Sequence, residues 1–163
     1  MSIGIRIQIA PDSGVLSALA KLALDRDDKT TLLDEIGINL AENARLRFTD
    51  QVTPDGQAWK PSLRAKAQGG ETLRDTGRLM ASITHAVSGD AVEYGTNLEY
   101  APFLHFGAEI KATAKPYLTF KVPGGGWARK KEVTLPARPF LGLSNEDEEL
   151  VVDIIGNFLR TSR

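Results

Sequence analysis

Residues 31–49 read TLLDEIGINLAENARLRFT, and this stretch decides much of the fold. Its apolar residues recur every three or four positions: Leu32, Leu33, Ile36, Leu40, Ala44 and Phe48. This spacing is the period of an α-helix with one apolar face. The sequence therefore predicts a long helix from about residue 31 to residue 49 that packs one side against a core.

Two further elements are expected before this helix. Residues 3–9 alternate isoleucine with glycine, arginine and glutamine, which is the pattern of a half-buried strand. Residues 11–14 (PDSG) break that pattern, and apolar residues over 15–23 then recur at helical spacing. The polar stretch 25–29 separates this shorter helical pattern from the long helix.

Residues 50–75, which follow the long helix, are rich in proline and glycine and poor in aliphatic side chains. Such a long loop is usually functional or mobile. We expect it to be poorly ordered in an isolated subunit and to become ordered on assembly. Trp59 lies inside it, and so large a ring must pack against the core or against a partner. We include Trp59 among the candidate assembly residues.

The next part of the chain predicts a hairpin between two short turns or helices. Residues 76–79 indicate a short turn or helix, and residues 100–106 indicate one helical turn. Between them, residues 82–87 and 91–96 are predicted strands, and Ser88-Gly89-Asp90 joins them as a tight turn.

A second hairpin is predicted from residues 117–122 and 128–135, with Pro123-Gly124-Gly125-Gly126 as a flexible tip. The surrounding segment, residues 110–131, holds six lysines and arginines and no acid. We expect it to be a basic arm that contacts an acidic surface of a neighbouring subunit. The candidate assembly residues in the arm are Lys115, Lys121, Arg129, Lys130 and Lys131.

A last helix is predicted to begin just after Ser144. Ser144 and Asp147 have the spacing of a capping box, in which each side chain binds the other residue's backbone N–H. The apolar stripe of this helix consists of Leu150, Val151, Ile154, Ile155, Phe158 and Leu159. Its acidic start supplies three more candidate assembly residues: Glu146, Glu148 and Glu149.

The order strand, helices, hairpin, hairpin, helix predicts an α+β fold. We expect an antiparallel sheet of hairpins packed against a long helix in the N-terminal half and a C-terminal helix. A length of 163 residues favours a single domain over 1–163. Within it, the mobile loop would span about 50–75 and the basic arm about 110–131.

Composition narrows the class of protein. Twenty basic residues against 21 acidic ones argue against a dedicated nucleic-acid binder of high pI. The absence of cysteine excludes disulfides and thiolate metal sites. The N-terminus does not read as a signal peptide, and no apolar run has the ~18 residues of a membrane helix. We expect a cytoplasmic protein without membrane contact.

Motifs for catalysis or cofactor binding are missing from the sequence. Its two histidines, His85 and His105, do not form an HExxH motif, and there is no GxSxG motif. The three glycines of the second hairpin lack the Lys-Ser/Thr of a phosphate-binding loop. We therefore predict no catalytic, metal-binding or cofactor-binding residues. Two alternatives stay open: a small hydrolase that uses His105, and a nucleic-acid-binding protein that uses residues 110–131.

Four segments together resemble the phage virion morphogenesis family, the tail-completion proteins of Mu-like and related phages. In chain order they are PDGQAWKP (54–61), LRDTGRLMASI (73–83), YGTN with YA and HFG (94–107), and PARPFLGLS (136–144). Each is weak alone, but their order and spacing from about residue 32 to residue 160 form a fairly specific combination. In the last segment, Pro136 and Pro139 fix an extended backbone, and we expect Arg138 to be free for a bidentate contact.

The resemblance implies a structural subunit of the phage neck or tail top. Such a subunit would act in tail completion, head–tail joining or tail termination, and would close into a ring, commonly of six copies. Its implied partners are copies of itself, neighbouring neck, connector or tail-tube proteins, and the DNA that passes through the ring lumen. It would be assembled in the host cytoplasm and then kept in the virion. The resemblance carries over no catalytic residue.

Overall fold

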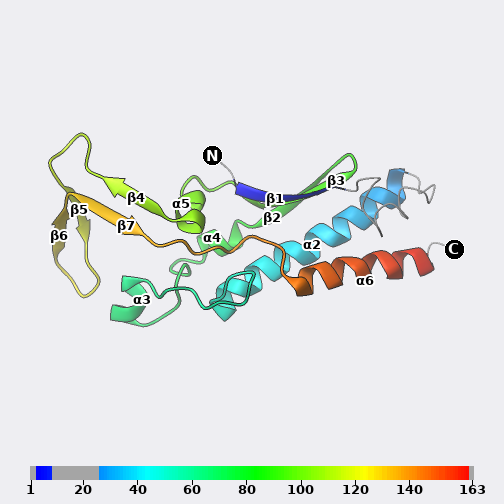
Figure 1. The fold of residues 1–163 in the computed structure, drawn as a ribbon, viewed down its shortest axis with the longest axis horizontal. Coiled ribbons are helices and arrows are strands. Elements are labelled where there is room, and N and C mark those ends of the chain that lie inside the picture. Colours follow the sequence, from blue (N-terminus) through cyan, green and yellow to red (C-terminus); the bar gives the residue numbers. More distant parts are fainter. Residues whose placement is uncertain (1–2, 9–25, 162–163) are drawn as a thin grey trace.

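The computed structural model describes residues 3–8 and 26–161 and confirms the α+β class. The molecule is elongated, with its longest helices toward one end and two hairpin-like ribbons at the other (Figure 1). The helices are α2 (Arg26–Asp50), α3 (Leu63–Gln68), α4 (Arg78–Ala81), α5 (Ala101–Phe106) and α6 (Asn145–Thr161). The strands are β1 (Ile3–Gln8), β2 (Thr84–Ser88), β3 (Ala91–Thr96), β4 (Ala108–Lys111), β5 (Leu118–Lys121), β6 (Trp127–Lys130) and β7 (Glu132–Leu135). The helical pattern predicted over 15–23 lies outside the described residues.

The largest sheet confirms the predicted first strand and first hairpin. Its strand order is β1-β3-β2, and both pairs are antiparallel. Gly89 turns the β2–β3 hairpin with a φ of 60°, a backbone conformation that suits glycine. Gly95 lets β1 approach β3, since a Cβ atom there would lie 2.2 Å from the carbonyl oxygen of Ile3.

Helix α2 is the centre of the core. Its predicted apolar residues are all buried: Leu32, Leu33, Ile36, Leu40, Ala44 and Phe48. The helix packs across β2 and β3 and also against α6. Among the described residues it begins at Arg26, so the stretch predicted as a polar gap is partly helical. Arg26 and Asp27 are exposed and Asp28 and Lys29 are half-buried, so these polar residues stay outside the core.

The predicted capping box opens α6. The backbone N–H of Ser144 donates to Oδ2 of Asp147 (2.8 Å), and the backbone N–H of Asp147 donates to Oγ of Ser144 (3.1 Å). Ile154 and Ile155 are buried. The rest of the predicted stripe is half-buried against the core: Leu150, Val151, Phe158 and Leu159. The capping box and the apolar stripe predicted for this helix are therefore confirmed.

The second predicted hairpin is confirmed at its tip but wrong in the extent of its second strand. The predicted strand 128–135 is two strands: β6 pairs with β5, whereas β7 pairs with the distant β4. The backbone N–H of Ala112 donates to the carbonyl oxygen of Lys131 (2.9 Å). At this bond the outer ribbon, formed by β5 and β6, meets the inner ribbon, formed by β4 and β7. The hairpins therefore do not form one sheet. From here on, the arm means residues 108–135, which contain both ribbons and extend the predicted basic arm (about 110–131) at each end.

The arm stands apart from the hydrophobic core. Along the chain, the buried apolar residues stop at Ala101 and resume at Phe140. Between these two positions only His105 and Arg138 are buried, and both lie outside the arm. In Figure 1 the arm accordingly projects from the body of the molecule, with β5 and β6 at its far end.

The segment 50–75 is more structured than a plain loop. It contains α3 and a short bridge between Val52 and Ala58. Gln51 ties its two ends together, because the Gln51 side chain bonds to both the N–H (2.6 Å) and the carbonyl oxygen (3.1 Å) of Thr72. That the order of this segment depends on assembly stays a prediction.

Candidate assembly surfaces

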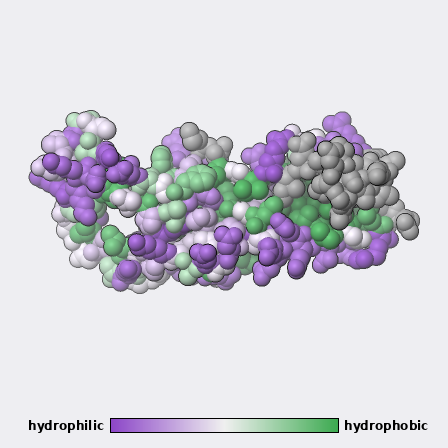
Figure 2. All heavy atoms as spheres, in the orientation of Figure 1, coloured by the Kyte–Doolittle hydropathy of each residue, from purple (hydrophilic) through white to green (hydrophobic). Residues whose placement is uncertain are grey.

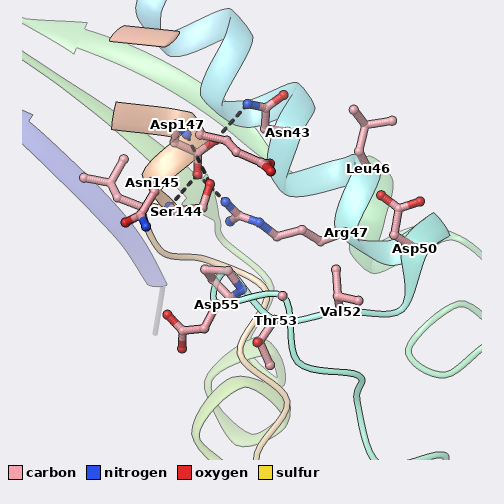
Figure 3. Close-up of a pocket in the computed structure, with 14 residues that line it drawn as sticks. Asn43, Leu46, Arg47, Asp50, Val52, Thr53, Asp55, Ser144, Asn145 and Asp147 are labelled. Carbon is pink, nitrogen blue, oxygen red and sulfur yellow. Dashed lines mark hydrogen bonds and ion pairs between the residues drawn. The ribbon is translucent and has the colours of Figure 1, made fainter. Parts of the chain in front are cut away.

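A buried ion pair joins α2 to the start of α6. The guanidinium of Arg47 is paired with Oδ2 of Asp147, and both side chains are almost fully buried. Arg47 also donates to the carbonyl oxygen of Gly142 (2.8 Å), and Asn43 donates to the other carboxylate oxygen of Asp147 (2.7 Å). Figure 3 shows Arg47 reaching from α2 to the capping box. No buried polar atom of these side chains lacks a hydrogen-bond partner, which is what a buried ion pair requires.

Tyr94 of β3 strengthens the same joint. Its hydroxyl donates to the carbonyl oxygen of Gly142 (2.9 Å), so this oxygen accepts bonds from both the sheet and α2. Burial is the largest cause that raises the pKa of Tyr94, and the hydroxyl therefore stays a donor at neutral pH. Contacts from α2 and β3 thus fix the position at which α6 begins.

Beside the joint lies a half-open hollow of about 480 Å³. It is bounded by the C-terminal part of α2, the turn at residues 52–56 and the first residues of α6 (Figure 3). Exposed carboxylates line it: Asp50, Asp55 and Glu146. Its apolar lining includes Leu46 and Leu143, which are 50% and 39% exposed. Its one lysine or arginine is Arg47, which is already paired with Asp147.

The structure corrects the assignment of Trp59 to an assembly surface. Trp59 is 5% exposed and belongs to the hydrophobic core. Its ring packs edge-on against Phe48, and its Nε1–H donates to the carbonyl oxygen of Pro139 (2.8 Å). The polar surroundings in sequence misled the prediction, because the ring is covered by residues far along the chain.

Arg138 is likewise not free for a partner, contrary to expectation. It is 6% exposed, and its Nε–H donates to the carbonyl oxygen of Lys60 (2.8 Å). Burial lowers the pKa of the Arg138 guanidinium from its usual value. The segment 50–75 is therefore held to the extended residues before α6 by two reciprocal hydrogen bonds. Trp59 donates from the segment, and Arg138 donates to it.

His105 is buried within an aromatic cluster. Its ring is edge-on to Phe106 and to Phe140, with centroids 4.5 and 5.0 Å away. The backbone N–H of Phe140 donates to its Nδ1 (3.4 Å), so that nitrogen is unprotonated. Burial lowers the pKa of His105, in agreement with a neutral ring.

The predicted charged candidates in the arm and at the start of α6 are exposed. These are Lys115, Lys121, Arg129, Lys130, Lys131, Glu146, Glu148 and Glu149. The five basic residues form no ion pair within the described part of the chain. Figure 2 shows hydrophilic residues gathered over the end of the molecule that the arm forms. The two sets of opposite charge lie on different parts of the molecule.

Exposed apolar side chains concentrate in and beside the arm. Of the 11 large hydrophobic residues that are exposed in the described part of the chain, six lie between residues 100 and 127. They are Tyr100, Phe103, Phe106, Ile110, Tyr117 and Trp127. Such a concentration of exposed apolar side chains is typical of an interaction site.

Sequence reasoning missed the Arg47–Asp147 pair and the hollow beside it. One signal was present: Arg47 falls on the apolar face of the long helix, next to Phe48, where a charge needs a buried partner. The partner itself could not be found, because Asp147 lies 100 residues away and its role in the capping box already accounted for it.

Two further properties concern metal sites and membrane contact. Among residues 3–8 and 26–161, no group of three or more histidine, cysteine, aspartate or glutamate side chains could hold a metal ion. In the same residues, no helix is long and apolar enough to cross a membrane.

Comparison with known proteins gives the class of this protein. Residues 11–160 match the model of the phage virion morphogenesis family, and the chain belongs to that family. Its role is therefore in the morphogenesis of a phage particle. The chain is also 30% identical, over 156 residues, to the Mu-like prophage FluMu G protein 2 of Haemophilus influenzae. The match covers 96% of both chains. No solved structure matches.

Proposed function

We propose that this protein is a structural subunit of the neck or tail top of a tailed phage. It acts without catalysis in tail completion, head–tail joining or tail termination, and it closes into a ring, with six copies as the expected number. Its further partners are neighbouring neck, connector or tail-tube proteins and the DNA in the ring lumen, but no membrane. It is assembled in the host cytoplasm and kept in the virion.

The observation that carries this proposal is the arm. Residues 108–135 add no buried side chain to the core, yet residues 100–135 hold six of the 11 exposed large hydrophobic residues in the described part of the chain. A two-stranded ribbon is marginally stable alone in water. An arm of this kind is best explained if a neighbouring protein covers it in the assembled particle. Family membership supports a particle component as that neighbour.

The surroundings of His105 favour a structural role over the alternative of a hydrolase. A general base must reach a substrate, whereas this ring is 8% exposed and wedged between Phe106 and Phe140. Its Nδ1 already accepts a backbone hydrogen bond. The ring accordingly supports the packing of α5 against the residues before α6.

The test is genetic complementation of the phage or prophage that encodes the chain. Without the protein, we expect heads and tails to accumulate unjoined or incomplete, as seen by electron microscopy. The wild-type gene supplied on a plasmid should restore infectious particles, and native mass spectrometry should find a defined multimer on isolated tails. Normal numbers of joined, infectious particles in the absence of the protein would refute the proposal.

A further inference from the structure

We propose that the β5–β6 hairpin of one copy docks into the acidic hollow of the next copy. This contact rests on the proposed ring and names its two complementary surfaces. The first surface is one face of the hairpin, and the second is the hollow between α2, the 52–56 turn and α6.

One face of the hairpin combines positive charge with an exposed aromatic ring. Thr119 pairs with Arg129, and Lys121 pairs with Trp127 across the two antiparallel strands. Cross-strand partners, and residues two apart on a strand, share a face. These four residues therefore lie on the same face, and all four are exposed, Trp127 by 68%. The opposite face carries the half-buried Leu118, Phe120 and Ala128.

The hollow has the complementary chemistry. Its exposed carboxylates, Asp50, Asp55 and Glu146, form no ion pair within the described residues. The guanidinium of Arg47, at its base, is held by Asp147 and does not neutralise them. Leu46 and Leu143 provide apolar contact in the same lining. An indole ring flanked by two cations fits a surface of two leucines and three carboxylates.

The two surfaces lie on different parts of the molecule. In Figure 1 the β5–β6 hairpin is at one end, whereas α6 starts near the middle and runs toward the other end. A contact between two different patches on identical subunits is heterologous, and such contacts close into rings when the rotation permits. A second copy is favoured over nucleic acid as the occupant, because the hollow is acidic and would repel phosphate.

A charge-swap experiment tests the contact. Lys121→Glu with Arg129→Glu should weaken self-association, measured by sedimentation velocity and by particle yield, at least about tenfold, because like charges would meet. Asp50→Lys with Glu146→Lys should do the same. The four changes combined should restore association. Lys66→Glu with Arg78→Glu, a matched reversal on exposed residues of α3 and α4, should have no effect.

Disulfide trapping checks the geometry in assembled particles. The chain has no cysteine, so any disulfide that forms joins introduced residues, and each single-cysteine variant controls for pairing of like positions. Thr119→Cys with Leu143→Cys should yield covalent multimers on oxidation, up to the full ring. The control pair Leu63→Cys with Leu143→Cys should not, since Leu63 is exposed on α3.

The outcomes separate this contact from the proposed function. If the protein is required for particles but the combined charge variant is not rescued and no covalent multimer forms, the contact is wrong and the function stands. If infectious particles form without the protein, the proposed function is wrong, whatever the charge variants show. Salt-sensitive binding of DNA that is lost with Lys121→Glu and Arg129→Glu would identify the hairpin as a nucleic-acid surface instead.

Discussion

Asp147 serves two structures at once. It caps its own helix through Ser144, and it neutralises Arg47 at the joint between α2 and α6. The capping role is local and visible in sequence, whereas the ion pair depends on how two distant helices meet.

We predict that Asp147→Ala lowers the free energy of unfolding by about 3–5 kcal/mol, because it leaves the buried Arg47 without a counter-charge. Urea denaturation of the purified subunit measures this. Glu148→Ala, an exposed neighbour, should change the value by no more than ~0.5 kcal/mol. A loss for Asp147→Ala as small as for Glu148→Ala would mean that the joint is not formed in solution.

His105 should make stability depend on pH. Its pKa in the folded protein lies below the usual value of 6.5, so the unfolded chain binds the proton more readily. Its contribution is therefore present above about pH 6.5 and is lost as the pH falls below that value. We predict that His105→Gln, which keeps hydrogen-bonding ability, shows a flatter loss of melting temperature between pH 7.5 and 5.5. Parallel curves for the two proteins would contradict the prediction.

At the scale of elements, α2 lies unusually close to the sheet at Gly37. A Cβ atom there would lie 2.5 Å from Cδ2 of His85 and 2.7 Å from Cγ2 of Val92. Gly156 in α6 is the matched opposite, with no heavy atom within 4 Å of the added carbon. Close packing therefore requires a glycine at position 37, whereas nothing in the packing requires one at position 156.

We predict opposite effects of alanine at these two positions. Gly37→Ala should destabilise the protein, because overpacking of roughly 1–3 kcal/mol outweighs the gain of about 1 kcal/mol in helix propensity. Gly156→Ala should stabilise it by about 0.5–1 kcal/mol. Thermal and urea unfolding of both variants measures this. Stabilisation by both would show that α2 can move away from the sheet at little cost.

Elements with local signals were predictable from the sequence, and elements defined by distant contacts were not. The long helix, the β2–β3 hairpin and the α6 capping box each follow from residues within one or two turns of each other. The split of residues 128–135 into two strands depends on β4, which lies about 20 residues earlier, and no local pattern marks that division. Likewise, the partners of Trp59 and Arg138 are backbone oxygens on segments about 80 residues away.

For the molecule as a whole, we infer that the arm and the body have separate roles in assembly. The buried apolar residues of the core lie outside 102–139, and none of the half-buried residues packed against them lies in the arm, so we expect the body to fold without the outer ribbon. The body supplies a fixed acidic hollow, and the arm supplies a basic, aromatic hairpin. The charge segregation read from the sequence therefore has a counterpart in space, although two of the residues assigned to assembly proved to be buried.

We predict that the outer ribbon can be removed without unfolding the body. Replacement of residues 113–130 by Asn-Gly would join β4 and β7 as a simple hairpin, since Ala112 and Lys131 are already hydrogen-bonded. The melting temperature should shift by no more than about 4 °C, which corresponds to about 1 kcal/mol for a chain of this size. Differential scanning calorimetry measures the shift. Loss of cooperative unfolding would show that the ribbon is part of the folding unit.

The two tryptophans occupy opposite environments: Trp59 is 5% exposed and Trp127 is 68% exposed. The molecule therefore carries two built-in fluorophores, one in the body and one on the hairpin. Emission from the buried indole follows unfolding, whereas emission from the exposed indole is open to collisional quenchers such as acrylamide. With Trp127→Phe to separate the two signals, the spectrum of the unlabelled protein distinguishes a subunit that has unfolded from one whose hairpin has become covered.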